Sequence, residues 1–198
     1  MSLLDDLNPV QRAAVLETEG PLLVFAGAGS GKTRVLTYRI AYLIREKGVA
    51  PWNIFAVTFT NKGAEEMRER LKRMVKGAVQ LWVSTFHSAA LRILRVYGER
   101  VGLKAGFVVY DEDDQTALIK EVLKELGLAA RPGPLKALLD RAKNRGEAPE
   151  SLLSELPDYY AGLSRGRLLD VLKRYEEALK AQGALDFGDI LLYALRLL

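Results

Sequence analysis

Residues 26–33, AGAGSGKT, have the composition of a loop that binds phosphate groups. Gly27, Gly29 and Gly31 allow backbone N–H groups to point toward phosphate oxygens at positions where a side chain would clash. Lys32 could contact the β- and γ-phosphates of a nucleotide, and the Thr33 hydroxyl could join the ligands of Mg²⁺. Lys32 and Thr33 are therefore the predicted catalytic residues, Thr33 is the predicted metal ligand, and ATP and Mg²⁺ are the predicted cofactors.

The residues around this loop fit the same chemistry. An apolar run, PLLVFA at residues 21–26, predicts a buried strand before the loop, and a helical pattern follows it. A helix that starts at the loop adds favourable partial positive charge at its N-terminus. The strict pattern has glycine where this sequence has Ala26. The alternative is a glycine-rich turn with a chance Lys-Thr pair, and the strand-loop-helix context argues against it.

The run FVVYDEDDQ, residues 107–115, is a second candidate for metal chemistry. Four apolar residues followed by Asp111 and Glu112 are typical of a strand end that holds Mg²⁺ in an ATPase. The same residues fit a helix start, with Asp111 as the N-cap and acidic residues at the positive end of the helix dipole. One side of that helix would be apolar, formed by Leu118, Ile119, Val122, Leu123 and Leu126. The residue pattern favours the cap and leaves the metal site open.

Strands and helices alternate in the first half of the sequence. Strands are predicted at residues 21–26, 53–60 and 79–86, and helices at residues 33–48, 61–77 and 87–102. This order predicts an α/β fold with a parallel sheet and right-handed crossovers. Ahead of it, Asn8 is a predicted N-cap and Pro9 the first residue of a short helix.

Helices dominate after about residue 110. Helical periodicity covers residues 113–127, 134–146, 166–183 and 186–198, and the breaks between them contain proline and glycine. We therefore expect a helical domain that follows the α/β domain or is inserted into it. The sequence ends on LLYALRLL, an apolar helix without a polar cap, and we expect it to be a fragment of a longer protein.

The composition excludes several classes of protein. The 198 residues contain no cysteine and one histidine, which excludes a disulfide framework, a thiolate metal site and a multi-histidine zinc cluster. There is no secretory signal and no apolar run long enough to span a bilayer, so a cytoplasmic protein without a membrane partner is expected. A net charge of +4 favours a polyanionic partner to a small degree.

Five further segments occur in a recognisable order. LNPVQRAAV precedes the phosphate loop, and VTFTNKGAEEM, STFHS, AKN and LDFGDIL follow it. Together they resemble the superfamily 1 DNA helicases of the UvrD/Rep/PcrA type, from Leu7 to the C-terminus. The resemblance implies a RecA-like P-loop parallel sheet with helices on both faces and an inserted all-helical accessory domain. Residues 1–108 would begin the ATP-binding motor domain, residues 109–184 would form the accessory domain, and residues 185–198 would return to the motor domain.

The resemblance also implies the residues that bind the nucleotide. LNPVQ resembles the Q motif of the family, in which the Gln11 amide would donate to one adenine atom and accept from another. Without the resemblance, Gln11 would be interpreted as a surface residue of a helix. The predicted nucleotide contacts are Gln11, Ala26, Gly27, Ala28, Gly29, Ser30, Gly31, Lys32, Thr33 and Arg34.

Single-stranded DNA is the predicted partner of two strand-to-helix corners. The predicted contacts are Phe59, Thr60 and Asn61 in the first corner and Thr85, Phe86, His87 and Ser88 in the second. Aromatic rings at these corners could stack on bases, and His87 is expected to contact the DNA backbone or order the loop rather than to act as a general base. The alternatives are a core role for Phe59 and a cap role for Asn61. Gly63 stands where the family commonly has alanine.

Two later segments give weaker signals. RAKNRG, residues 141–146, is basic and would either face DNA or form a solvated helix face, and the two possibilities weigh equally. Asp186 and Asp189 in LDFGDIL are further candidate DNA contacts, and here the sequence departs from the family, which usually has a second acidic residue where Gly188 stands.

The predicted function is the N-terminal portion of an ATP-dependent 3′–5′ DNA helicase that acts in DNA repair at single-strand/duplex junctions. The resemblance implies that Asp111 and Glu112 are structural and that the true Asp-Glu metal motif lies beyond Leu198, so the fragment itself is expected to be inactive. One alternative is a self-contained P-loop ATPase or kinase that uses Asp111 and Glu112 as its metal motif. The other is a non-catalytic DNA-binding module.

Overall fold

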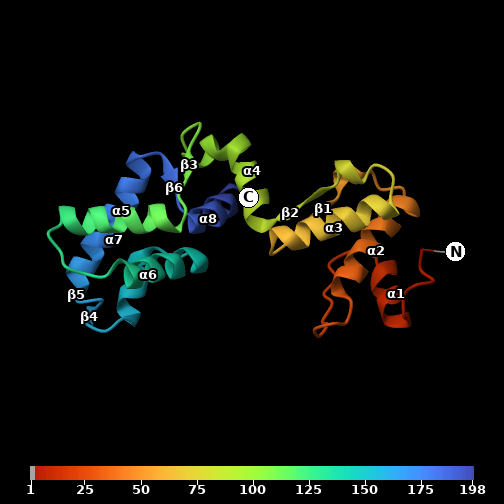
Figure 1. Ribbon diagram of the computed structural model, residues 1–198, viewed down its shortest axis with the longest axis horizontal. Coiled ribbons are helices and arrows are strands. Elements are labelled where there is room, and N and C mark those ends of the chain that lie inside the picture. Colours follow the sequence, from red (N-terminus) through yellow and green to blue (C-terminus); the bar gives the residue numbers. More distant parts are fainter. Residues whose placement is uncertain (1–2) are drawn as a thin grey trace. The chain divides into compact units, whose positions relative to one another are not determined.

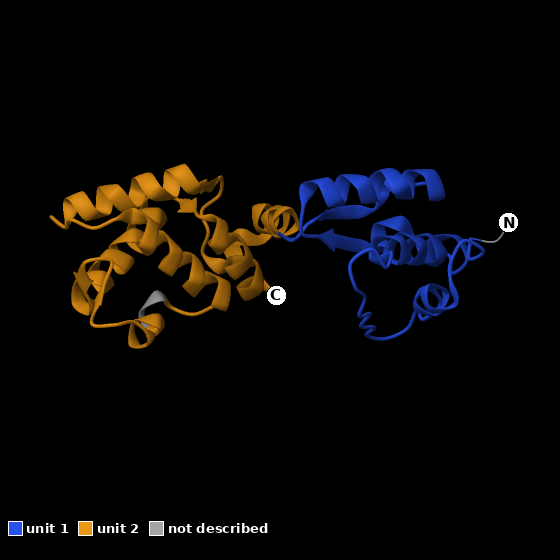
Figure 2. Cartoon of the chain, turned by 60° about the horizontal axis from the view of Figure 1, so that its bottom comes forward, with its two compact units in different colours: residues 1–86 blue, residues 87–198 orange. Residues whose placement is uncertain are grey.

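The computed structural model describes residues 3–198, apart from the side chains of residues 149 and 150, and divides the chain into two compact units. Unit 1 comprises residues 1–86 and unit 2 comprises residues 87–198 (Figure 2). This division falls at residue 86, whereas the sequence predicts a domain limit at residue 108. The functional domain limits stay a prediction. None of the described helices is long and apolar enough to cross a membrane.

Unit 1 is built around one parallel strand pair and its crossover helix. β1 (Phe55–Thr58) pairs with β2 (Trp82–Thr85) in parallel, in the register Phe55↔Trp82 to Thr58↔Thr85. α3 (Asn61–Met74) connects the strands and lies along them (Figure 1). α1 (Pro9–Leu16), α2 (Lys32–Arg45), η1 (Pro51–Asn53) and η2 (Ala78–Gln80) complete the unit. The predicted parallel pairing of these two strands is confirmed.

The apolar core of unit 1 lies between α2, α3 and the two strands. It consists of the buried side chains of Ile40, Ala41, Ala56, Ala64, Met67, Leu71, Val75, Leu81 and Val83. The helices also have the predicted start signals. Asn8 accepts a hydrogen bond from the backbone N–H of Gln11, whose side chain accepts one from the N–H of Asn8, so α1 begins with a capping box.

The prediction of a buried strand at residues 21–26 is wrong. These residues form no regular element, and Phe25 is 89% exposed. A parallel strand is stable when neighbouring strands satisfy its backbone and other elements cover both of its faces. Among the described residues, β1 pairs with β2 only, so the run PLLVFA has apolar composition without the partners that would bury it.

Unit 2 is mainly helical, as the sequence predicts. Its longer helices are α4 (Phe86–Tyr97, which starts at the last residue of unit 1), α5 (Glu112–Glu125), α6 (Pro132–Arg145), α7 (Arg165–Ala181) and α8 (Phe187–Leu197). Short elements connect them: η3 (Gly98–Val101), β3 (Val108–Val109), η4 (Pro149–Glu155), β4 (Tyr159–Tyr160), β5 (Leu163–Ser164) and β6 (Ala184–Leu185). β3 pairs with β6 in parallel, and β4 with β5 in an antiparallel hairpin.

Two apolar cores hold unit 2 together. The larger one joins α5, α6 and α7, and the predicted apolar side of α5 contributes Leu118, Ile119, Val122 and Leu123 to it. The smaller one joins α4 to α8 through Ala90, Leu94, Phe107, Leu185, Ile190 and Ala194. The last residues of the chain therefore pack against residues that precede the predicted accessory domain.

A buried lysine connects α6, α7 and α8. The side chain of Lys143 is 3% exposed, and its Nζ lies 2.9 Å from Glu176 Oε1, 2.6 Å from Asp186 Oδ2 and 2.9 Å from Asp189 Oδ1. Tyr175 donates its hydroxyl proton to Asp186 Oδ2 at 3.0 Å. Burial lowers the pKa of Lys143, but the carboxylates of Asp189, Glu176 and Asp186 outweigh it, so the net pKa lies above its usual value.

The start of α8 is fitted closely around this lysine. Asp186 caps α8 by accepting from the Asp189 N–H at 3.0 Å, and the Asp189 side chain accepts from the Asp186 N–H in return. A Cβ on Gly188 would lie 2.8 Å from Lys143 Cβ, so only glycine allows α8 to approach α6 this closely. Burial raises the pKa of the Asp189 carboxyl to about 6. Asp186, Gly188 and Asp189 therefore have structural roles.

Replacing Lys143 is expected to destabilise unit 2 strongly. Lys143→Ala would leave three carboxylates close together without the ammonium, two of them buried, and removing one partner of a buried ion pair costs about 3–5 kcal/mol. Arg141→Ala is the control, because Arg141 pairs with Glu155 at an exposed position, where such a pair is worth about 1 kcal/mol or less. Urea unfolding followed by helical circular dichroism would compare the two variants. Equal stability losses would contradict the role given to Lys143.

Candidate functional site

The phosphate loop is closed by its own lysine. Gly29 and Gly31 have φ of +74° and +87°, a left-handed conformation that glycine adopts readily, and Gly31 is the N-cap of α2. Lys32 Nζ donates to the carbonyl oxygens of Ala26 at 2.9 Å and of Gly27 at 2.7 Å. An ammonium group has three donors, so two hold the loop and the third stays available for a phosphate oxygen.

The other loop residues lie around the same turn. Ser30 Oγ donates to the carbonyl oxygen of Gly27 at 2.7 Å, which links the two ends of the turn. Thr33 is exposed in the first turn of α2, where a hydroxyl could reach a metal ion beside the phosphates. The exposed N-terminus of α2 and the glycines in front of it can accept an anion. The loop thus has the chemistry that its sequence predicts.

Gln11 is attached to this loop. Its Nε2 donates to the carbonyl oxygen of Ser30 at 3.0 Å, and its Oε1 accepts from the N–H of Asn8 at 3.2 Å. A glutamine amide has two donor hydrogens and two acceptor lone pairs, so one of each is left for a base. Gln11 therefore anchors α1 to the loop and keeps the capacity for the predicted adenine contact.

Arg34 is held by the segment that precedes α1. Its Nη2 donates to the carbonyl oxygen of Asp6 at 2.6 Å, and Tyr38 donates to Asp6 Oδ2 at 3.1 Å. These bonds tie the N-terminal segment to the first turns of α2. The predicted nucleotide contact of Arg34 would have to be made by the remaining guanidinium donors.

The two predicted DNA-contacting corners are neighbours in unit 1. Thr58 is paired with Thr85 at the ends of β1 and β2, so both strands end at the same edge. The rings that follow, Phe59 and Phe86, lie 5.6 Å apart between centroids, and Phe59 is 90% exposed. An exposed aromatic pair at the carboxyl ends of parallel strands is a surface on which nucleic-acid bases can stack.

The polar residues of these corners differ in exposure and in their role at the helix start. Thr60 is the N-cap of α3 and accepts from the Gly63 N–H at 3.0 Å, while Asn61 is exposed as the first residue of the helix. The alternative in which Asn61 caps the helix is therefore wrong, because Thr60 is the N-cap. A Cβ on Gly63 would lie 3.0 Å from the hydroxyl oxygens of Thr58 and Thr60, so glycine keeps this corner tight. Thr85 is buried, which leaves its hydroxyl away from the surface.

In unit 2, His87 has an aromatic partner, Phe187, that was not among the predicted site residues. The rings of His87 and Phe187 are stacked, with centroids 3.9 Å apart and planes 15° from parallel. Burial lowers the pKa of His87, so the imidazole is neutral at neutral pH. Ser88 follows as an exposed residue in the first turn of α4. The sequence does contain a signal for Phe187. This residue follows Asp186, the N-cap of α8, and its ring therefore lies at the start of that helix.

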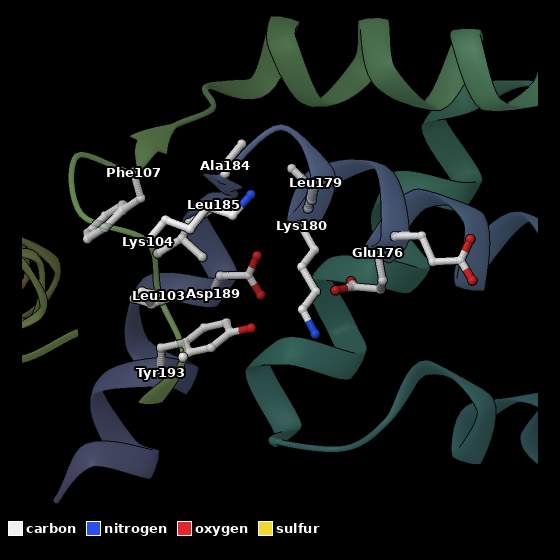
Figure 3. A pocket seen from close by; sticks show the side chains of 13 residues that line it. Leu103, Lys104, Phe107, Glu176, Leu179, Lys180, Ala184, Leu185, Asp189 and Tyr193 are labelled. Carbon is white, nitrogen blue, oxygen red and sulfur yellow. The ribbon is translucent and has the colours of Figure 1, made fainter. Parts of the chain in front are cut away.

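Unit 2 contains two cavities lined by residues of the features described above. One of about 400 Å³ has both His87 and Phe187 in its lining, together with Lys136 and Asn144. The other, of about 340 Å³, is lined by α7, α8 and the loop that contains Leu103 and Phe107, and Figure 3 shows Asp189 and Tyr193 directed into it. The aromatic stack thus borders the first cavity, while the second adjoins two ion-pair partners of Lys143, Glu176 and Asp189.

The acidic run at residues 111–114 is a helix cap. Asp111 Oδ1 accepts from the N–H groups of Asp113 and Asp114, both at 2.9 Å, and the Asp114 side chain accepts from the Asp111 N–H. In the described part of the chain, no group of three or more histidine, cysteine, aspartate or glutamate side chains could hold a metal ion. The cap prediction is confirmed.

The basic stretch 141–146 is occupied by internal ion pairs. Lys143 is buried, and Arg141 and Arg145 both pair with Glu155, the latter at 2.9 Å. The interpretation as a solvated helix face is therefore wrong for Lys143, and the pairing of both arginines with Glu155 counts against a DNA-facing surface. The net positive charge lies elsewhere: unit 1 has 12 basic and 8 acidic residues, and unit 2 has 17 of each.

Comparison with known proteins identifies the family. Residues 7–198 match the family model described as the UvrD/REP helicase N-terminal domain. The chain belongs to this family. It is 46% identical to the ATP-dependent DNA helicase PcrA of Bacillus subtilis, over 98% of the chain and 26% of that protein. It is 42% identical to the PcrA helicase of Staphylococcus aureus, over 99% of the chain and 27% of that protein. The chain therefore spans about a quarter of the length of these family members.

The role of Asp111 can be tested directly. Asp111→Ala is expected to lower the free energy of unfolding by about 0.5–2 kcal/mol through loss of the N-cap. Binding of a Mg²⁺-nucleotide should be unchanged, because Asp111 and the phosphate loop have separate roles. Urea unfolding and isothermal titration with a non-hydrolysable ATP analogue would measure the two effects. Asp113→Ala is the matched control, and a loss of nucleotide binding specific to Asp111→Ala would contradict the cap assignment.

Proposed function

We propose that this chain is the ATP-binding and DNA-binding part of an ATP-dependent DNA helicase. The observation that carries the proposal lies in unit 1, where a glycine loop closed by Lys32 and an exposed aromatic pair on neighbouring strand ends occur together. The relatives named above are ATP-dependent DNA helicases, and the chain matches them over nearly its whole length.

The proposed architecture is the RecA-like P-loop sheet. Its support is the β1-α3-β2 unit, in which two parallel strands are joined by a helix as in every α/β sheet of this class. We assign residues 1–108 to the motor domain, residues 109–184 to an accessory domain and residues 185–198 to the return to the motor domain. The packing of α8 against α4 supports this last assignment.

The nucleotide would be held by consecutive loop residues. Backbone N–H groups of residues 26–34 and the N-terminus of α2 would bind the phosphates, Lys32 would neutralise the β- and γ-phosphates, and Gln11 would contact adenine. The Thr33 hydroxyl would hold Mg²⁺, which neutralises charge between these phosphates when it is bound. Opening and closing of the nucleotide site in the whole protein would change its grip on DNA.

Single-stranded DNA would lie across the two strand-to-helix corners. Phe59 and Phe86 would stack on bases, Thr60 and Asn61 would donate or accept hydrogen bonds, and His87 and Ser88 would contact the backbone as neutral groups. Phe187 is a further candidate contact within unit 2, because its ring stacks on that of His87. The positive charge of unit 1 favours a polyanion there. The junction specificity, the 3′–5′ direction and the repair role stay predictions of the resemblance.

The nucleotide assignment is tested with Lys32→Ala. We expect this variant to bind a Mg²⁺-ATP analogue at least about tenfold more weakly, because the phosphates lose their charged partner. Lys47→Ala is the control and should bind normally, because Lys47 is an exposed lysine two residues after the end of α2. Isothermal titration measures both, and equal binding by the two variants would contradict the proposed site.

ATP hydrolysis distinguishes the proposed function from a self-contained ATPase. Because Asp111 is engaged as a cap, we expect no turnover by the 198-residue chain, with or without single-stranded DNA. Turnover that is abolished by Asp111→Ala with Glu112→Ala would show that the acidic run is a metal motif after all. A coupled phosphate-release assay gives this result.

The DNA assignment is tested with Phe59→Ala. Loss of one base-stacking ring costs about 1–3 kcal/mol, so binding of an oligothymidylate should weaken by about fivefold or more. Tyr159→Ala, an exposed aromatic residue of the unit 2 hairpin, is the matched control. Fluorescence anisotropy of labelled DNA measures the affinities. The proposal fails if Phe59→Ala and the control bind equally well.

A further inference from the structure

Unit 1 exposes a second group of apolar side chains, at the starts of β1 and β2. Trp52 is 67% exposed, Phe55 53% and Val79 78%. η1 carries Trp52 and contacts η2, which carries Val79. The rings of Phe55 and Trp82 lie 4.7 Å apart between centroids. We name Trp52, Phe55, Val79 and Trp82 the η surface.

A basic groove adjoins the η surface. It has a volume of about 440 Å³, and residues 72–79 line it, ending at Val79. Lys72, Arg73 and Lys76 provide three cations along this lining, which contains no acidic residue. Lys72 pairs with Glu69 on the exposed side of α3, an interaction that salt and competing carboxylates can readily replace. The groove therefore favours an anionic occupant.

The composition of this region indicates a protein partner rather than nucleic acid. Aromatic residues are enriched at the centres of protein interfaces, where apolar contacts supply most of the binding energy, and charged residues form the rim. Single-stranded nucleic acid also binds aromatic rings beside cations, but at the η surface the rings of Phe55 and Trp82 lie against each other and the most exposed member is the aliphatic Val79. The η surface has an aromatic and aliphatic centre, and its cations lie along one side.

We propose that the η surface and its basic groove bind a segment of another protein that presents carboxylates beside aliphatic or aromatic side chains. The apolar side chains of the segment cover Trp52, Phe55 and Val79, and its carboxylates lie along Lys72, Arg73 and Lys76. Each strand has four residues, so this region lies about 10 Å along the strands from the ends that carry Phe59 and Phe86. The partner and single-stranded DNA thus use opposite ends of the strand pair.

The tryptophans allow a direct measurement. The sequence contains two, Trp52 and Trp82, and both belong to the η surface, so intrinsic fluorescence reports on this region without a label. The probe is a synthetic peptide of about 15 residues with Leu and Phe at helical i, i+3, i+4 and i+7 spacing and Glu and Asp elsewhere. We expect a saturable change in tryptophan emission with the 198-residue chain.

Two control peptides separate the contribution of apolar contact from that of charge. One replaces Leu and Phe by Ser, and the other replaces Glu and Asp by Lys. Each should bind at least about tenfold more weakly, because the site needs apolar contact and opposite charge together. A lysine-substituted peptide that binds as well as the acidic one would overturn the charge argument.

Variants of the protein test whether the peptide binds at the η surface. Val79→Asp adds a negative charge and removes an apolar contact, and we expect about tenfold weaker binding of the acidic peptide. Val10→Asp is the matched control, since Val10 is a valine with 80% exposure on α1, outside the η surface. Lys76→Glu should weaken binding and reduce its dependence on salt. Circular dichroism checks that all three variants are folded.

Three results would overturn the proposal. The first is no change in tryptophan emission with the acidic peptide. The second is equal peptide binding by Val79→Asp and Val10→Asp. The third is displacement of the peptide by an oligothymidylate from the unsubstituted chain but not from the Val79→Asp variant. This result would show that the η surface binds nucleic acid.

Discussion

The arrangement of unit 2 depends on one buried ammonium group. Lys143 of α6 receives carboxylates from α7 and from the first turn of α8, and breaking any of these contacts would leave charge in an environment of low polarity. Asp186 takes part in this cluster and caps α8 at the same time. Phe187 follows Asp186 in the chain, so the buried ion cluster also fixes the ring that stacks on His87. The position of the exposed Phe187 ring thus depends on the buried ion pairs of Lys143.

Unit 1 follows a different principle, because the register of one parallel strand pair sets the position of its exposed groups. Pairing of Thr58 with Thr85 brings two strand-to-helix corners together, and each corner begins with a phenylalanine. Pairing of Phe55 with Trp82 at the other end brings the η surface together in the same way. Two chemically different surfaces therefore arise from a single ladder of backbone hydrogen bonds.

Local signals in the sequence predicted most elements, and features that depend on distant partners were missed. Capping at Asn8 and Asp111 and the helices they start are encoded within a few residues, so the pattern identified them. The run at residues 21–26 is apolar, but a strand needs neighbours that composition does not reveal. Lys143 looked like one of several solvated cations in RAKNRG, because its burial depends on carboxylates more than thirty residues away. The need for glycine at position 188 could not be predicted for the same reason, because it arises from the close approach of Lys143 on another helix.

The phosphate loop has internal hydrogen bonds that hold its shape and still has donors that can bind a phosphate group. Lys32 donates to two carbonyl oxygens of the loop, and Gln11 donates to a third, so the turn is held by neutral acceptors. Hydrogen bonds between an ammonium group and an ionised acceptor are about twice as strong as those between neutral groups. A phosphate oxygen can therefore take the free donor of Lys32, or replace a carbonyl, at little cost. The glycines make this exchange possible, since they let the backbone turn its N–H groups toward the anion as the lysine moves.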